Sequence, residues 1–178
     1  MTPAPGPARE ARIMPRLAGL LALAVLAGCT PRAPLPPPPR DLVTLAVATV
    51  ENQTGSDLVV SGDDIVARWL DRPKRTVSDV LREDLRRALD ERGFTVADGG
   101  AVPALRVVLR RFEPDLPQLT WVDVALGAKL VDPDGTVRWE DDRSRWLVSV
   151  RGAPSLAAAY ESAARDVARA LVGGWRAR

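Results

Sequence analysis

Few residue types in this chain could carry out chemistry. Its 178 residues include one cysteine, Cys29, and no histidine. Histidine is the commonest general base and metal ligand, and cysteines and Ser–His pairs supply many enzymatic nucleophiles. Because Cys29 is the only thiol, a disulfide framework within the chain is excluded. We therefore predict that the protein is not an enzyme and requires no metal or other cofactor.

Acidic residues at short spacing offer the remaining options. Asp132 and Asp134 have the spacing that opens a calcium loop, but a glycine stands at the fourth position and no glutamate at the twelfth. The sequence DPDG, which ends at Gly135, instead predicts a tight turn. The adjacent acids Asp63-Asp64 and Asp141-Asp142 are typical of loops. None of these patterns indicates a site for acid–base catalysis.

Cys29 follows a short apolar segment. Three arginines precede this segment, which runs from Leu17 to Val25 and closes on the sequence LAGC at residues 26–29. Such a segment is shorter than the roughly 20 residues needed to span a bilayer, so it predicts a cleaved export signal. LAGC resembles the lipobox of bacterial lipoproteins. The resemblance implies that Cys29 becomes the first residue and carries a lipid anchor with fatty acyl chains such as palmitate.

The chain accordingly divides into three parts. Residues 1–28 are the signal peptide, and residues 29–40 are the lipidated cysteine and a proline-rich linker, which favours an extended polyproline II spacer. Residues 41–178 are the folded domain. Of the 25 Lys+Arg and 23 Asp+Glu residues, three arginines and one glutamate lie in the signal, which leaves 22 of each sign. This balance does not indicate nucleic-acid binding.

The clearest secondary-structure signal is a helix over residues 76–92. Thr76 and Asp79 have the spacing of a capping box. Apolar residues recur on one helical face, and Gly93 predicts a left-handed end with Phe94 folding back onto the last turn. A second helix is expected after Ser155, and it ends at Gly173-Gly174.

Strands are predicted over residues 41–50, 94–97, 105–112, 121–131 and 137–150, the last either as one long strand or broken at Glu140-Asp141-Asp142. The element order is therefore β-α-β-β-β-β-α, with a further short strand at residues 58–60 and a helical turn at residues 65–70. Hairpin links favour an antiparallel sheet. We expect a single α+β domain, with a mainly antiparallel sheet and two helices packed on one face.

Five tryptophans stand beside one tyrosine and two phenylalanines. Trp69 and Trp146 are predicted to lie in the core. Trp121 follows a loop with two prolines and is expected on the wetter face of its strand. Together with Leu116 and Leu119 it forms the candidate contact site, with the alternative that these residues cover the end of the core.

Several segments resemble the ABC-type transport auxiliary lipoproteins, the family of the paraquat-inducible lipoprotein. The likeness lies in residues 67–73 (ARWLDRP), the helix VSDVLREDLRRAL, the strand LRVVLRRFE, the hairpin AKLVDPDGTVRW and the alanine-rich last helix. It departs from the family pattern at Lys74-Arg75. The resemblance implies a non-enzymatic envelope lipoprotein that is an accessory component of a lipid-transport complex linking the two membranes.

A second resemblance leaves an alternative open. LAVATVENQTG followed by a helix ending in ERGF is similar to lipoproteins of the curli-assembly and penicillin-binding-protein-activator type. This likeness implies an activator or assembly factor for a cell-wall synthase or a secretion pore. Both alternatives predict protein partners in the envelope. Because Thr30 rather than aspartate follows Cys29, resemblance to lipoprotein sorting implies the outer membrane, facing the periplasm.

Overall fold

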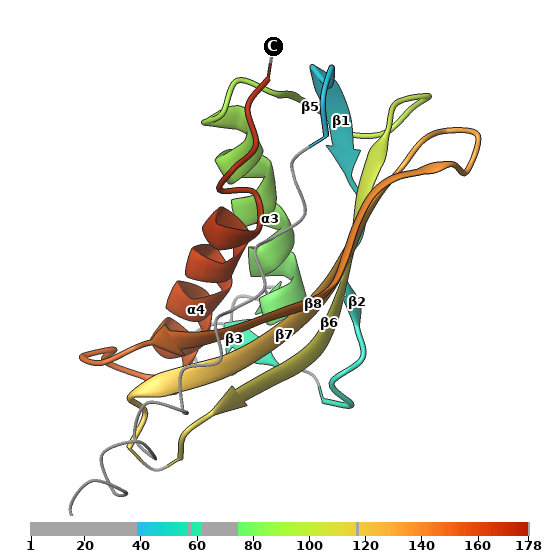
Figure 1. Cartoon of the computed structure of the whole chain (residues 1–178). Helices are drawn as coiled ribbons and strands as arrows, with labels where there is room; N and C mark the ends of the chain where they lie inside the picture. Colours follow the sequence, from blue (N-terminus) through green and yellow to red (C-terminus); the bar gives the residue numbers. More distant parts are fainter. Residues whose placement is uncertain (1–38, 57, 62–74, 117, 178) are drawn as a thin grey trace, which may run out of the picture. The chain divides into compact units, whose positions relative to one another are not determined.

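A computed structural model describes residues 39–56, 58–61, 75–116 and 118–177 (Figure 1). Several predicted features lie outside the described residues. They are the signal, Cys29, most of the linker, the helical turn at residues 65–70 and Trp69. No helix in the described part is long and apolar enough to cross a membrane.

The domain is built on a six-stranded mixed sheet with the order β5-β1-β6-β7-β8. β6 (Ala104–Pro114), β7 (Trp121–Val131) and β8 (Val137–Ser149) form an antiparallel meander. β1 (Thr44–Val47) lies between β5 (Thr95–Ala97) and β6, and the two-residue β2 (Glu51–Asn52) also pairs with β6. β3 (Val59–Ser61) and β4 (Arg75–Thr76) form a separate antiparallel pair. The predicted α+β class is confirmed.

One part of the sheet differs from the antiparallel arrangement that the hairpin links favoured. β1 is parallel to both of its neighbours, with Thr44 opposite Thr95 and Ala46 opposite Ala104. The reason is the connection, because a helix joins β1 to β5 and such a crossover places the two strands parallel. The result is a mixed sheet that is still mainly antiparallel.

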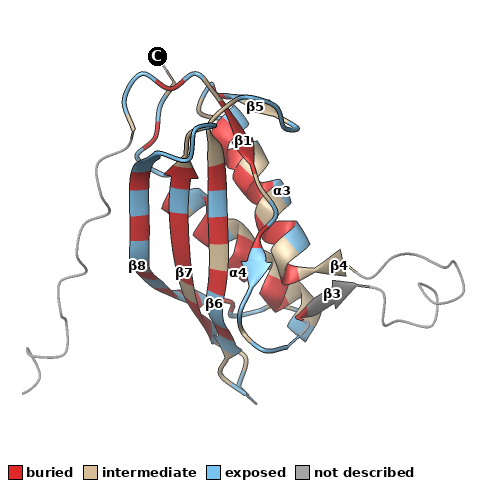
Figure 2. Ribbon diagram, turned by 90° about the vertical axis from the view of Figure 1, so that its right-hand side faces the viewer, coloured by how far each residue is buried: buried red, intermediate tan, exposed pale blue. Residues whose placement is uncertain are grey.

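Two helices pack on one face of the sheet (Figures 1 and 2). α3 (Val77–Asp90) begins with the predicted capping box: Thr76 Oγ1 accepts from the Asp79 amide at 3.3 Å, and the Thr76 amide donates to the Asp79 carboxylate at 2.9 Å. Gly93 adopts φ +88°, and Phe94 is buried against the helix end. α4 (Leu156–Leu171) begins at Ser155, whose hydroxyl accepts from the Ala158 amide at 3.1 Å.

The core lies between the helices and the inward face of the sheet. On β7 the inward side chains are Val122, Val124, Leu126, Ala128 and Leu130, all buried as the alternation predicted. Trp146 is buried, as predicted, and so are Trp139 and Trp175, whose rings meet edge to face at 5.1 Å between centroids. β8 is one continuous strand with two irregularities in its pairing to β7.

The sheet has two distinct ends. Residues 41–43 enter β1 beside the start of β6, since Ala46 is opposite Ala104. β6 then runs to Pro114 at the other end, where the loop to β7 begins (Figure 2). The point where the chain enters the domain therefore lies at the opposite end from the β6–β7 loop.

Candidate contact surface

The loop between β6 and β7 is organised by Asp115. Its carboxylate accepts hydrogen bonds from the backbone amides of Thr120 and Trp121, at 2.7 and 3.0 Å, and from the Thr120 hydroxyl. The Asp115 backbone also bonds to Trp121 O and to the Leu119 amide. These bonds join Asp115, at the start of the loop, to Leu119, Thr120 and Trp121 at its end.

The electrostatics of Asp115 favour the ionised carboxylate. Partial desolvation acts to raise its pKa, but the hydrogen bonds from the Thr120 hydroxyl and from the backbone amides of Trp121 and Thr120 outweigh that effect and lower the pKa below its usual value. The carboxylate is therefore charged near neutral pH, and its bonds to the loop amides are charge-assisted.

The three predicted contact residues lie on or beside this loop, but their environments differ. Leu116 is 69% exposed and Trp121 is 38% exposed. Leu119 is half-buried and packs against the core, with φ +49°, an uncommon conformation for a residue other than glycine. The loop thus turns Leu119 inward while Leu116 and Trp121 face solvent.

Leu147 is a further exposed side chain that the sequence reasoning missed. It is 68% exposed and lies on β8, two residues from Ser149, which is directly opposite Trp121. A hollow of about 260 Å³ is lined by Thr120, Trp121, Leu147, Ser149 and Arg151. The signal was present in the sequence, because Trp146 and Val148 both point into the core and the alternation turns Leu147 outward.

We call the exposed side chains Leu116, Trp121 and Leu147 the apolar ledge. They come from the β6–β7 loop, the first residue of β7 and the end of β8. Trp121 and Leu147 line the same hollow, and Leu116 lies in the loop that leads to Trp121. Exposed apolar side chains that gather on one surface are typical of a contact site. Tryptophan in particular supplies a large contact area and one N–H donor.

A charged cluster on the same face of the sheet borders the ledge. Asp123 is buried, and its carboxylate accepts from Arg145 Nε at 2.7 Å and Arg145 Nη2 at 2.5 Å, with Arg111 Nη1 at 3.4 Å. The bonds from Arg145, opposed by desolvation, lower the pKa of Asp123, and the charges of Arg145 and Arg111 lower it further. This ionised centre fixes β7 to both neighbouring strands beside the ledge.

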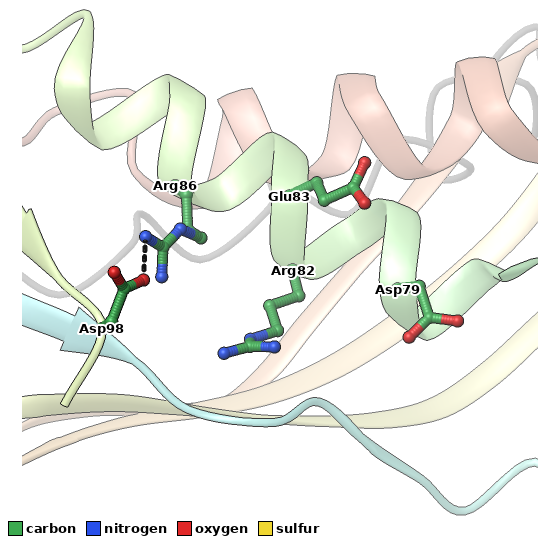
Figure 3. A pocket seen from close by; sticks show the side chains of 5 residues that line it. All are labelled: Asp79, Arg82, Glu83, Arg86 and Asp98. Carbon is green, nitrogen blue, oxygen red and sulfur yellow. Dashed lines mark hydrogen bonds and ion pairs between the residues drawn. The ribbon is translucent and has the colours of Figure 1, made fainter.

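A second hollow, of about 250 Å³, lies beside α3 (Figure 3). It is lined by Asp79, Arg82, Glu83, Arg86 and Asp98. Its charges are already partnered: Arg86 pairs with Asp98 at 2.6 Å, Glu83 pairs with Arg75, and Arg82 Nε donates to a backbone carbonyl. This arrangement is a surface ion network rather than a reactive centre. The described residues also contain no group of three or more acidic, cysteine or histidine side chains placed to hold a metal ion.

Comparison with known proteins identifies the family. The model of the ABC-type transport auxiliary lipoprotein component matches residues 38–172, which include both described helices and the strands of the main sheet. The chain belongs to this family. The resemblance seen in the sequence is therefore confirmed, and the family is a transport auxiliary component rather than an enzyme family.

Solved structures similar to this auxiliary lipoprotein include a dodecamer of a PelC variant from Paraburkholderia phytofirmans, at 15% identity and a TM-score of 0.52, covering 82% of this chain and 95% of that one. Protein XCC0632 from Xanthomonas campestris is 22% identical, with a TM-score of 0.46, and the match covers 79% of this chain and 90% of that one. Lipoprotein GNA1162 from Neisseria meningitidis is 12% identical, with a TM-score of 0.41, and the match covers 71% of this chain and 99% of that one. At these identities the PelC likeness shows a shared fold alone. No curated protein matches the sequence significantly.

Proposed function

We propose that the protein is a non-enzymatic envelope lipoprotein that serves as an accessory component of an ABC-type transport complex moving lipids between membranes. The family match over residues 38–172 supports the transport role. The LAGC sequence supports a lipid anchor at Cys29, and Thr30 after it favours the outer membrane, with the domain facing the periplasm.

The observation that carries the contact mechanism is the apolar ledge. Leu116, Trp121 and Leu147 are exposed at the end of the sheet opposite the point where the chain enters the domain. A tether at the entry end leaves the ledge free to face away from the membrane that holds the anchor. The hydrogen bonds from the Thr120 and Trp121 amides to Asp115 hold the start of β7 in place, which reduces the conformational entropy that partner binding would cost.

Site-specific photocrosslinking in intact envelopes tests this proposal. A photoreactive residue is placed at Leu147 or Trp121 and, as a matched control, at Val137, which is also apolar, exposed and on β8 but lies at the other end of the sheet. We expect crosslinks to subunits of an ABC-type transporter from the ledge positions only. Crosslinks to a cell-wall synthase or a secretion pore would support the alternative role, and equal crosslinking from Val137 would contradict the ledge as the contact site.

Complementation provides a second measurement. Leu147→Ala combined with Trp121→Ala should abolish rescue of the envelope defect of a deletion strain while the protein remains at normal abundance. Val137→Ala should rescue fully. Full rescue by the ledge variant would refute the contact mechanism.

A further inference from the structure

The open face of the sheet, opposite the helices, contains a hollow of about 450 Å³ that none of the functions above uses. It lies over the middle of β6 and β7, between the segment that joins β1 to β2 and the middle of β8. Its outward-facing lining includes Arg106, Val108, Arg110, Gly127 and Lys129, with Glu51 and Asp142 at its margins. Its volume is within the range of small-molecule sites.

Gly127 allows Arg110 to lie across β7. It occupies an outward position on this strand, opposite Val108 of β6. A Cβ at this position would lie 3.0 Å from Arg110 Nη2 and 3.1 Å from Arg110 Cζ. The guanidinium of Arg110 therefore lies directly over the β7 backbone at Gly127, and its Nη1 donates to the backbone carbonyl of Asp142 at 2.7 Å.

Some of the charged side chains that line the hollow have a partner of opposite charge, and others do not. Lys129 pairs with Glu140 at 2.8 Å, and Glu51 accepts from the side chain of Gln53 at 2.7 Å. Arg110 bonds to a carbonyl and not to a carboxylate. Arg106 has no ion-pair or hydrogen-bond partner in the part of the chain that the structure describes. Among the described residues, two guanidinium groups without a carboxylate partner thus flank Val108.

The presence of arginines without a carboxylate partner distinguishes this hollow from the one beside α3. There, Arg86 is paired with Asp98, and three acids outnumber two arginines. Guanidinium groups present several N–H donors in a planar fork that matches phosphate and carboxylate oxygens. Val108 supplies an apolar contact between the two arginines.

We propose that this hollow binds an anionic group, a phosphate or a carboxylate, attached to an apolar moiety that lies on Val108. Arg106 and Arg110 bind the anion, and Gly127 lets the Arg110 guanidinium lie close to the β7 backbone. An anionic lipid headgroup and a free phosphate compound share this chemistry. The site is separate from the apolar ledge and does not depend on the transport role.

Calorimetric titration of the full chain in a neutral detergent tests the proposal. The probes are short-chain phosphatidylglycerol, short-chain phosphatidylcholine with the same acyl chains, and inorganic phosphate. We expect the anionic phospholipid to bind more tightly than the zwitterionic one, and Arg106→Gln and Arg110→Gln each to weaken that binding about five-fold. Arg86→Gln removes the same charge from the helix layer and should have no effect. Binding of inorganic phosphate with the same arginine dependence would assign the site to a free phosphate compound.

Two results would overturn the proposal. One is equal binding of the two phospholipids together with no binding of phosphate. The other is selective binding that neither Arg106→Gln nor Arg110→Gln weakens. Gly127→Ala provides an independent check, because the added Cβ would push the Arg110 guanidinium from its place and should reduce binding, while every charged side chain that lines the hollow remains. Circular dichroism of each variant confirms that the fold is retained.

Discussion

Replacing Asp123 with asparagine tests how the open face of the sheet is held together. The carboxylate is buried and accepts two short bonds from Arg145 and a longer one from Arg111. A hydrogen bond to a charged group contributes about 1.5–3 kcal/mol. The arginine side chains are 64% and 45% exposed, so they rehydrate when the partner is lost. We therefore expect Asp123→Asn to lower the free energy of unfolding by about 1–3 kcal/mol, less than for a fully buried pair.

The pH dependence of the free energy of unfolding gives a sharper expectation for this substitution. Because the pKa of Asp123 is lower in the folded protein than in the unfolded chain, its ionisation stabilises the fold at pH values above the unfolded pKa of about 4. That stabilisation is lost as the pH falls through the folded pKa. The difference between wild type and Asp123→Asn should therefore be largest near neutral pH and should shrink in acid.

Urea unfolding followed by circular dichroism, at neutral pH and in acid, measures both effects. Asp98→Asn is the matched control, because Asp98 also pairs with an arginine at 2.6 Å but its side chain is 92% exposed. This control should change stability little at any pH. Equal stability of wild type and Asp123→Asn at neutral pH, or a difference that persists unchanged in acid, would refute the reasoning.

Three other predictions concern the anchor, the tryptophans and the helix cap. Cys29→Ala should release the protein from membranes and remove the mass of the lipid, and membrane fractionation in high salt with mass spectrometry checks this. Trp146→Ala should cost about 3–5 kcal/mol, whereas Trp121→Ala, at a partly exposed site, should cost about 1–2 kcal/mol; equal costs in urea titrations would show that Trp121 is a core residue. Thr76→Ala should cost about 1 kcal/mol by thermal unfolding, with Thr76→Ser restoring most of it.

The elements with local signals could be predicted from the sequence. α3 has its cap, its apolar face and its terminal glycine within a single stretch, so no distant contact was needed to place it. β7 was predicted with its observed bounds, because its alternation is bounded by a loop and by the DPDG turn. The order of the main elements followed from these signals and is confirmed.

Features that depend on distant partners could not be predicted. The parallel pairing of β1 with β5 follows from the crossover through α3, but the pairing of β1 with β6 depends on a strand that lies much later in the chain, and the pattern of residues 41–50 does not specify that partner. Asp123 stands among outward positions yet is buried, because Arg145 and Arg111 cover it from two other strands. The partners that fix the β6–β7 loop belong to Asp115, a residue that the sequence alone did not distinguish from other loop acids.

The placement of the chain entry and the apolar ledge at opposite ends of the sheet has a mechanical consequence. β1, which receives the chain, lies between β5 and β6 and is hydrogen-bonded on both sides. A pull between a tether at the entry end and a partner at the ledge acts along the strands. Such a force loads several backbone hydrogen bonds together in shear, instead of opening them one after another. The domain is therefore suited to carry tension applied between its entry end and the ledge without unfolding from its first strand.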